Sequence, residues 1–194
     1  MITSKKDYIR YLAQDRKALG IKKPTFKNRL IEHVAPNHIY KFQKLLRKKE
    51  YYLNCKKGLV NKILYQLIKL KFRNISIKLG FTIPENVFGP GLAIVHYGTI
   101  VVNGNARIGK NCRIHACTNI GASGGSKKAP RIGDNVYIGP GAKIYGDISI
   151  GNNIAIGANA TVFKNFEESG VMIAGNPAKV IKQIDIKRII KHIK

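Results

Sequence analysis

The chain has 194 residues, 44% of them apolar, so it can bury one core and is too short for a multidomain enzyme. The chain contains 35 Lys and Arg residues but only 10 Asp and Glu residues, which gives a formal charge of +25. This charge favours anionic partners but does not distinguish phosphates, nucleic acid, acidic glycans and an anionic membrane. The sequence shows no signal peptide and no membrane span, and its three cysteines lack the CxxC spacing of a zinc or redox site. We therefore expect a cytoplasmic protein in a reducing compartment.

Residues 1–80 predict a small, basic helical region. They hold 21 of the 35 basic and 4 of the 10 acidic residues, a net charge of +17. Apolar residues recur there at helical spacing in three groups, which are Tyr8, Leu12 and Leu19; Ile39, Phe42, Leu45 and Leu46; and Leu59, Ile63, Leu67 and Leu70. Pro24 and Pro36 predict breaks between helices. The Lys-rich face is either simply solvated or binds anions or a membrane surface.

A branched aliphatic residue recurs every six positions through the rest of the chain, interrupted only at Ser126. The repeated positions are Val102, Ile108, Ile114, Ile120, Ile132, Ile138, Ile144, Ile150, Ile156 and Val162. A Gly often follows them, and a small or branched residue stands four positions later. This period fits neither an α-helix nor an alternating strand. It predicts a parallel β-helix with three faces, one hexapeptide to each face, and a loop at residues 122–131.

Three segments carry a resemblance to a known family: HYGTIVVNGNARIG (96–109), NIGASGG (119–125) and AGNPAKVI (174–181). With the repeat, they resemble the hexapeptide-repeat acyltransferases, especially the serine acetyltransferase-like branch and its polysaccharide O-acetyltransferase type. The resemblance implies a mainly-β chain: a left-handed β-helix over residues 81–182, after the helical region 1–80 and before a short C-terminal helix at 183–194. It also implies a homotrimer with active sites between subunits, and acetyl-CoA as the acetyl donor.

Two histidines in the β-helix are the candidate catalytic residues. His96 stands one hexapeptide before Val102 and one predicted coil before Ile114, where the repeat calls for an aliphatic side chain. Its imidazole can take the proton from an alcohol that attacks a thioester, and its HYGT context resembles the catalytic motif of the family. His115 lies one coil and one residue later, so it could sit diagonally beneath His96 and orient the acceptor or assist the base. The alternatives are a capping role for His96 and simple exposure for His115, and two histidines are too few for a zinc site, so we expect no metal.

The resemblance also implies where acetyl-CoA binds. In the family it lies along the groove between subunits, and the matching column here is Ala122, Pro140 and Ala158, each one predicted coil from the next. Small side chains or a proline let a ligand approach the main chain. The basic loop and Lys179 in the closing segment supply charge for the CoA phosphates. Ordinary turn chemistry and a solvated loop are the alternative explanations.

The acceptor is predicted from three departures. The serine-specific pattern of the family has polar residues at the positions of Phe81, Val95 and Ala129, and an apolar pocket does not repay the desolvation of a zwitterion. We therefore predict an acetyl-CoA-dependent O-acetyltransferase acting on a sugar hydroxyl in surface or capsular polysaccharide biosynthesis, with His96 as general base and a small-molecule or oligosaccharide acceptor. Serine O-acetyltransferase of cysteine biosynthesis is the nearest alternative, and a non-catalytic β-helix scaffold the second. We expect no nucleic-acid partner, since no recognition motif appears, while membrane contact through the basic region stays open.

Overall fold

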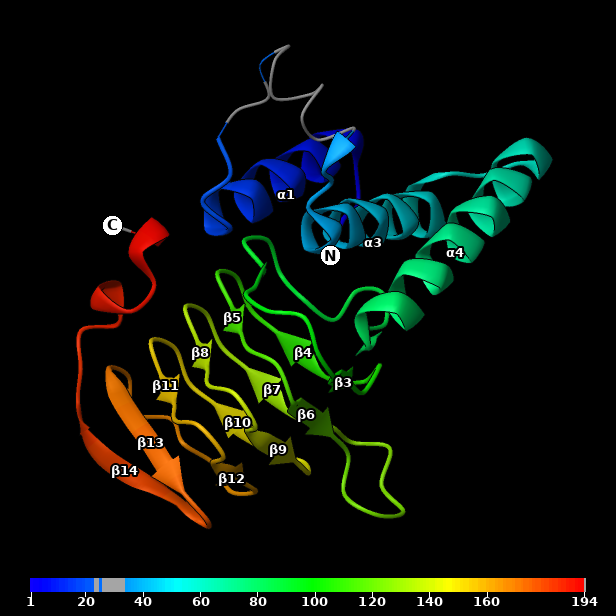
Figure 1. Cartoon of the computed structure of the whole chain (residues 1–194). Coiled ribbons are helices and arrows are strands. Elements are labelled where there is room, and N and C mark those ends of the chain that lie inside the picture. The colour runs from blue at the N-terminus through cyan, green and yellow to red at the C-terminus, as the bar shows by residue number, and fades with distance from the viewer. Residues whose placement is uncertain (23–24, 26–33, 194) are drawn as a thin grey trace.

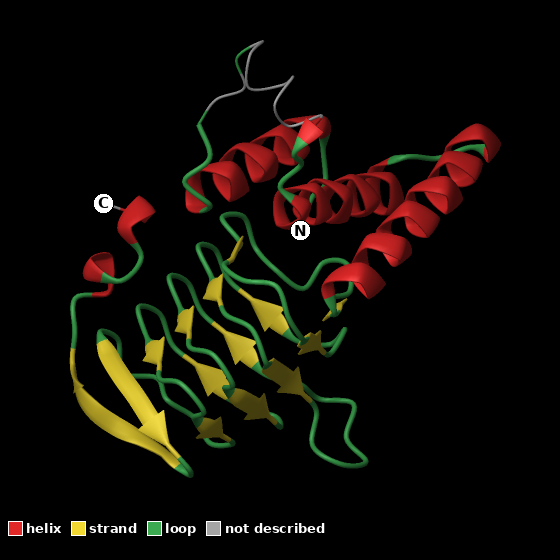
Figure 2. Cartoon of the chain, in the orientation of Figure 1, coloured by secondary structure: helices red, strands yellow, loops and turns green. Residues whose placement is uncertain are grey.

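The computed structural model describes residues 1–22, 25 and 34–193. In this part of the chain, three α-helices precede a stack of short strands and lie together at one end of it (Figures 1 and 2). The helices are α1 (Lys5–Ala18), α3 (His38–Cys55) and α4 (Leu59–Leu79). The break predicted at Pro36 stands just before α3, whereas Pro24 lies outside the described residues.

The strands form three sheets, and the chain visits each sheet in turn. The first sheet contains β1 (Phe81–Thr82), β3 (Ile100–Val102), β6 (Thr118–Gly121), β9 (Lys143–Tyr145) and β12 (Thr161–Val162). The second contains β4 (Arg107–Ile108), β7 (Arg131–Ile132) and β10 (Ser149–Ile150). The third contains β2 (Ala93–Ile94), β5 (Arg113–Ile114), β8 (Tyr137–Ile138), β11 (Ala155–Ile156), β13 (Val171–Gly175) and β14 (Ala178–Gln183). All neighbours pair in parallel except β13 and β14, so the arrangement fits the predicted β-helix.

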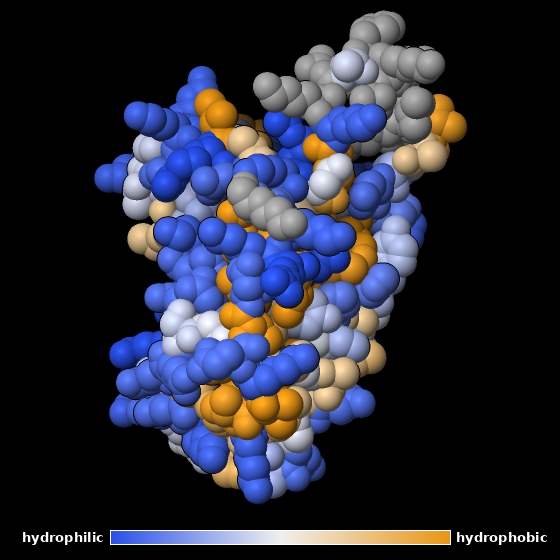
Figure 3. Space-filling view, turned by 90° about the vertical axis from the view of Figure 1, so that its left-hand side faces the viewer, coloured by the Kyte–Doolittle hydropathy of each residue, from blue (hydrophilic) through white to orange (hydrophobic). Residues whose placement is uncertain are grey.

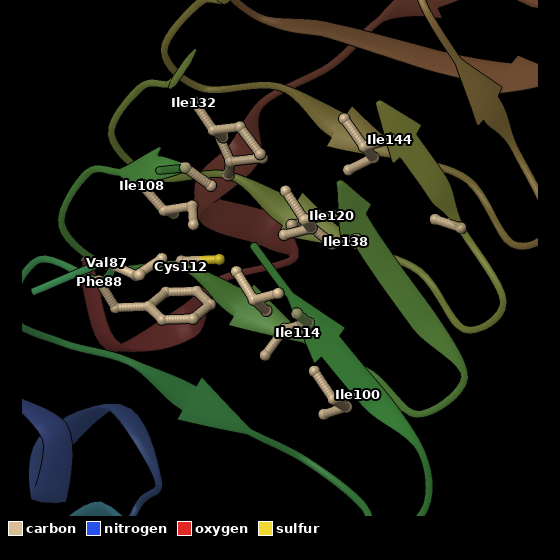
Figure 4. Close-up of a cluster of buried hydrophobic side chains, with 14 of the residues drawn as sticks. Val87, Phe88, Ile100, Ile108, Cys112, Ile114, Ile120, Ile132, Ile138 and Ile144 are labelled. Carbon is tan, nitrogen blue, oxygen red and sulfur yellow. The ribbon is translucent and has the colours of Figure 1, made fainter. Parts of the chain in front are cut away.

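The residues repeated every six positions fill the inside of the coils. All ten of the predicted aliphatic side chains are at most 4% exposed, and Figure 4 shows several of them gathered in the interior. The second predicted inward set is also buried, from Ala106 and Cys112 to Ala160. Burial stabilises by about 25 cal/mol for each Å² of apolar surface removed from water, so this repeat supplies the main core.

Asparagines shape one corner of the stack. Asn111, Asn135 and Asn153 adopt positive φ angles of 59°, 57° and 58°, which this residue type tolerates better than most. Their amides also join successive coils: Asn111 Nδ2 donates to Asn135 Oδ1 (2.8 Å), and Asn135 Nδ2 donates to Asn153 Oδ1 (2.9 Å). Each amide therefore serves both the turn and the stacking.

The coils differ in length. In the third sheet, Ile94 pairs with Ile114, Ile114 with Ile138, and Ile138 with Ile156. Only the last of these coils has the length of three hexapeptides, because the first is slightly longer and the second contains a whole extra hexapeptide. The second coil holds the predicted loop, which the structure places between β6 and β7. Since the insertion there equals one repeat, it leaves the hexapeptide register intact.

A buried cluster of charges joins the helices to the first coil. Arg47 of α3 donates from Nε to Asp15 Oδ2 (2.7 Å) and from an Nη to Glu50 Oε2 (3.0 Å). It also donates to the backbone carbonyls of residues 88–89, at 2.9 and 2.7 Å. Asp15 in turn accepts the N–H groups of residues 91–92, at 2.8 and 2.9 Å. Because these charges are desolvated and hydrogen-bonded on several sides, they hold the helices in one position on the β-helix.

The three predicted helices are present, but α4 does not pack through its predicted apolar stripe. Leu59, Ile63, Leu67 and Leu70 are 75%, 55%, 50% and 55% exposed. The buried side chains of α4 lie on its other face, and they are Ile68, Phe72, Ile75 and Leu79. The apolar period therefore locates this helix without identifying the face that packs.

The predicted C-terminal helix is not continuous. After β14 the chain forms two short 3₁₀ helices, η1 (Ile186–Arg188) and η2 (Lys191–Ile193). Asp185 caps the first by accepting from the backbone N–H two residues later (3.0 Å). Ile186 and Ile190 are at most 5% exposed, packed against side chains of the third sheet. The segment follows this surface to bury its isoleucines, and β-branched residues are only moderate helix formers.

The face that carries the C-terminal segment is mostly hydrophilic, with apolar patches between the polar side chains (Figure 3). Among the described helices, none combines the length and apolar character needed to cross a lipid bilayer.

Candidate active site

His96 lies at the corner of the first coil between the third and first sheets. Ile94 pairs with Ile114, so Ile94 fills the inward position that the repeat had assigned to His96. That register prediction is wrong because this coil is longer than three hexapeptides, and the extra length moves the imidazole to the outside. The backbone N–H of Val95 donates to the carbonyl of Ile114 (3.1 Å) and fixes the corner on the next coil. His96 is exposed and accessible to a ligand.

The structure places His115 beside His96, as the spacing predicts. The centroids of the two imidazoles lie 5.6 Å apart, with their planes tilted by 54°. Tyr137, one coil further along, continues the row at 5.0 Å from the His115 ring. Sequence reasoning missed Tyr137, although an aromatic residue at an outward position just before Ile138 was a signal for it. Three rings from successive coils thus form one wall of the corner.

The His115 side chain is neutral at ordinary pH. Burial, followed by the charges of Arg113 and His96, lowers the pKa of His115 to about 4. Its Nε2 is buried and has no hydrogen-bond partner among the described residues. A neutral imidazole can donate or accept a single hydrogen bond at this atom, depending on its tautomer. His115 is therefore suited to pack as a neutral ring beside His96 and unsuited to store a proton.

The predicted column of small residues is partly wrong. Pro140 and Ala158 lie in register on adjacent coils, and the residue below Pro140 is Ala116. The carbonyls of Ala116 and Pro140 accept backbone N–H groups from the next coil, at 3.0 and 2.8 Å. Ala122 instead follows β6 at the start of the loop, at the corner between the first and second sheets. The second coil contains one extra hexapeptide, so a step of three hexapeptides back from Pro140 ends one face away, at Ala122. The residues that share the corner of His96 are Ala116, Pro140 and Ala158.

The basic loop and Lys179 lie away from this corner. Lys128 Nζ donates to Asp147 Oδ2 (2.6 Å), and the carbonyl of Lys127 accepts from Asn105 Nδ2 (2.7 Å). Lys179 is exposed on β14, at the opposite end of the third sheet from β2. With about 4.8 Å between strands, five steps separate these ends by roughly 24 Å. Lys179 therefore marks the far end of the stack and does not contact the histidines.

The three apolar departures do not line one pocket. Phe81 is 3% exposed and packs edge-on against Phe42, with ring centroids 5.1 Å apart. Ala129 is buried in the loop before β7, and only Val95 adjoins His96. These residues therefore do not form an apolar acceptor pocket within one chain, and the physical argument against a zwitterionic acceptor fails.

Comparisons with known proteins point to one group. Residues 129–164 match the family described as "Bacterial transferase hexapeptide (six repeats)". A serine acetyltransferase of Mycobacterium tuberculosis is 40% identical over 102 residues, which cover 52% of this chain and 44% of that protein. One of Staphylococcus xylosus is 34% identical over 136 residues, covering 69% and 59%. The chain thus spans about half the length of the curated relatives it matches.

A solved structure agrees over most of the chain. The crystal structure of the serine acetyltransferase of Neisseria gonorrhoeae superimposes with a TM-score of 0.69 and 26% identity, covering 93% of this chain and 68% of that one.

These relatives overturn the predicted sugar acceptor, because they are serine acetyltransferases. Polysaccharide O-acetylation is therefore the wrong reading of the sequence, and the serine alternative agrees better with the comparisons. The parallel sheets, the matched hexapeptide repeat and the structural neighbours together fit a left-handed β-helix. The chain is thus similar in fold to the hexapeptide-repeat transferases and in sequence to the serine acetyltransferases.

Proposed function

We propose that this protein is an acetyl-CoA-dependent serine O-acetyltransferase. The observation that carries the proposal is the exposed His96 imidazole beside the neutral His115, at the head of a corner lined by small residues. The serine acetyltransferase relatives support serine as the acceptor. Solved serine acetyltransferases in complex with coenzyme A and with cysteine share the fold.

His96 acts as the general base in the proposed reaction. It takes the hydroxyl proton of serine as that oxygen attacks the thioester carbonyl of acetyl-CoA. The tetrahedral intermediate then collapses, the C–S bond breaks, and the proton passes to the CoA thiolate. The products are O-acetylserine and free CoA. His115 packs beside His96 and supports the position of its ring, and its low pKa keeps it from competing for the proton.

The corner that carries His96 continues along the coils as an edge, and we assign acetyl-CoA, the acetyl donor, to this edge. Ala116, Pro140 and Ala158 follow one another along this edge, and their small or cyclic side chains let a pantetheine arm approach the backbone. Lys179 lies on β14 at the far end of the stack, where its ammonium group binds the phosphate groups of CoA. We also propose the homotrimer, in which the edge of one copy faces a neighbouring copy and completes the groove.

The test measures thiol release from acetyl-CoA with L-serine and, in parallel, with mono- and oligosaccharides. We expect turnover with L-serine, and the His96→Ala variant should lower kcat by about 10²–10⁴-fold while leaving the Kd for CoA unchanged. His192→Asn serves as the matched control, because this histidine lies near the C-terminus and contacts Asn111, which stands between β4 and β5 and not at the corner of His96. No turnover with serine, or full activity in His96→Ala, refutes the proposal.

A further inference from the structure

Helix α4 has two apolar faces, and one of them is exposed. Its buried side chains pack on the rest of the protein through the face that contains Phe72. Ile63 stands nine residues from Phe72, which is two and a half helical turns, so it lies on the opposite face. An exposed apolar set, which we call the α4 stripe, gathers around Ile63 and consists of Leu59, Val60, Ile63, Leu64, Leu67, Leu70 and Ile77. At 1.5 Å per residue the α4 stripe is roughly 27 Å long.

Basic side chains run along both margins of the α4 stripe. Lys62, Lys69 and Arg73 are seven and four residues apart, which places them on one margin. Lys71 and Lys78 are seven residues apart and lie on the other margin. All five are exposed, and the sequence of α4 contains neither Asp nor Glu. The free face of α4 is therefore apolar in the middle and basic on both sides.

This pattern is typical of a helix that lies in the plane of a lipid surface. The apolar side chains enter the boundary between head groups and acyl chains, and the long stems of Lys and Arg carry their charges back to the lipid phosphates. Among the described helices none can cross a bilayer, so α4 would lie along the surface. Its N-terminal half projects beyond the coil stack, which leaves that part of the α4 stripe away from the coils (Figure 1).

Charge favours a lipid surface over a second copy of this chain as the partner of the α4 stripe. Because both margins are basic, two α4 stripes that pair in either direction would bring like charges together, which is unfavourable. The head groups of anionic phospholipids complement both margins at once.

We propose that α4 docks this protein on an anionic lipid surface, with the α4 stripe inserted at the level of the head groups. The five basic residues of its margins then bind the lipid phosphates. The proposal is independent of the acetyl-transfer reaction.

Vesicle flotation of the full chain tests the contact. The vesicles contain phosphatidylglycerol and phosphatidylcholine in equal parts, and vesicles of phosphatidylcholine alone are the neutral arm. The Ile63→Gln/Leu67→Gln variant removes apolar surface from the α4 stripe without changing the net charge, and Gln is a good helix former. Val180→Gln/Ile181→Gln is the matched control, because these residues are 46% and 57% exposed, against 55% and 50%, and lie on β14 at the other end of the stack.

We expect the stripe variant to bind the anionic vesicles about tenfold more weakly than the wild type, and the control to bind less than about twofold more weakly. The wild type should bind neutral vesicles at least about tenfold more weakly than anionic ones. Circular dichroism shows that each variant is folded.

A tryptophan reporter shows which surface enters the lipid. The chain contains no Trp, so Leu67→Trp places a single indole on the α4 stripe and Ile181→Trp places one on β14. With anionic vesicles, the emission of Leu67→Trp should shift to shorter wavelength and become protected from acrylamide, because its indole leaves water. The emission of Ile181→Trp should not change.

Three results overturn the proposal. One is absence of wild-type binding to the anionic vesicles. Another is equal binding by the wild type and the stripe variant with unchanged emission of Leu67→Trp, which is the behaviour of diffuse charge. The third comes from sedimentation velocity: a smaller oligomer in the stripe variant, together with absence of vesicle binding by the wild type, assigns the α4 stripe to contact with a second copy.

Discussion

Replacing Arg47 by methionine measures how much stability depends on the buried charges between the helices and the first coil. The change keeps an apolar side chain of similar length and removes the guanidinium that lies 2.7 Å from Asp15 and 3.0 Å from Glu50. All three side chains are at most 2% exposed. The variant therefore leaves two carboxylates buried without their cation.

The expected loss follows from these contacts. Stranding a buried charge by removing its partner costs about 3–5 kcal/mol. Asp15 keeps the N–H groups of residues 91–92, which lowers the cost, while the carbonyls of residues 88–89 lose their donors, which raises it. We expect the free energy of unfolding at pH 7.5 to fall by about 4 kcal/mol, a large part of the roughly 5–15 kcal/mol of a typical domain.

Urea unfolding followed by circular dichroism, at one protein concentration, measures this loss. The control is Arg10→Met, which breaks an ion pair with Asp7 whose arginine is 55% exposed and should cost under about 0.5 kcal/mol. A loss below about 1 kcal/mol, or one equal to that of Arg10→Met, would show that Asp15 and Glu50 do not need the Arg47 guanidinium for the fold to be stable.

Three further predictions follow from single residues. In Gly133→Ala the new Cβ would lie 2.8 Å from the backbone of the next coil, so urea unfolding should show a loss of about 1–3 kcal/mol. Gly124→Ala is the control, because its new Cβ meets nothing within 4 Å and should change stability by under about 0.5 kcal/mol. Equal effects of the two variants would contradict the close stacking of the coils at Gly133. A thiol reagent should label the exposed Cys117 in the folded protein but Cys112 only on unfolding, because burial raises the pKa of the Cys112 thiol; simultaneous labelling would show that the coil opens. The pKa of His115 falls from 6.5 to about 4 on folding, so its contribution to stability is complete above pH 6.5 and is lost as the pH falls toward 4. After discounting for solvent screening of this partly buried ring, we expect a loss of about 1–2 kcal/mol in acid titrations of unfolding, and a His115→Gln variant as steep as the wild type would exclude this residue as the cause.

The sequence predicted the core of the β-helix well because one physical demand repeats in every coil. On each face, one inward position needs a branched aliphatic side chain, and Ile114, Ile138 and Ile156 meet that demand whatever lies between them. The same regularity hid the lengths of the coils. An inserted hexapeptide keeps the pattern in phase while it shifts every later residue by one face, and so Ala122 was assigned to the wrong corner.

The candidate site depended on local irregularities that the repeat does not encode. His96 was identified from its break in the pattern, and its nearness to His115 was predicted, although its register was not. The missing information was the length of the first coil, which depends on how residues 95–99 turn. The acceptor was misjudged because Phe81 was counted as a pocket residue, whereas it packs on Phe42 in the core.

Burial in the helical region was harder to predict. Arg47 is fully buried, while Leu59 and Ile63 are exposed, the reverse of what residue type alone indicates. Which face of a helix packs depends on the surface offered by the first coil, and that surface includes backbone carbonyls that only a buried donor satisfies.

The two ends of the coil stack are closed by different devices. At one end, side chains of α3 bind carbonyls of the first coil, and at the other, β14 runs antiparallel to β13 and reverses the direction of the last edge (Figure 1). A stack of parallel coils with open ends would present the same edge to another molecule and could grow into a fibre. In this protein, a coil of a second molecule would meet α3 at one end and the antiparallel strand β14 at the other. The end pieces thus set where the solenoid stops, and whole coils can be gained or lost between them without changing either terminus.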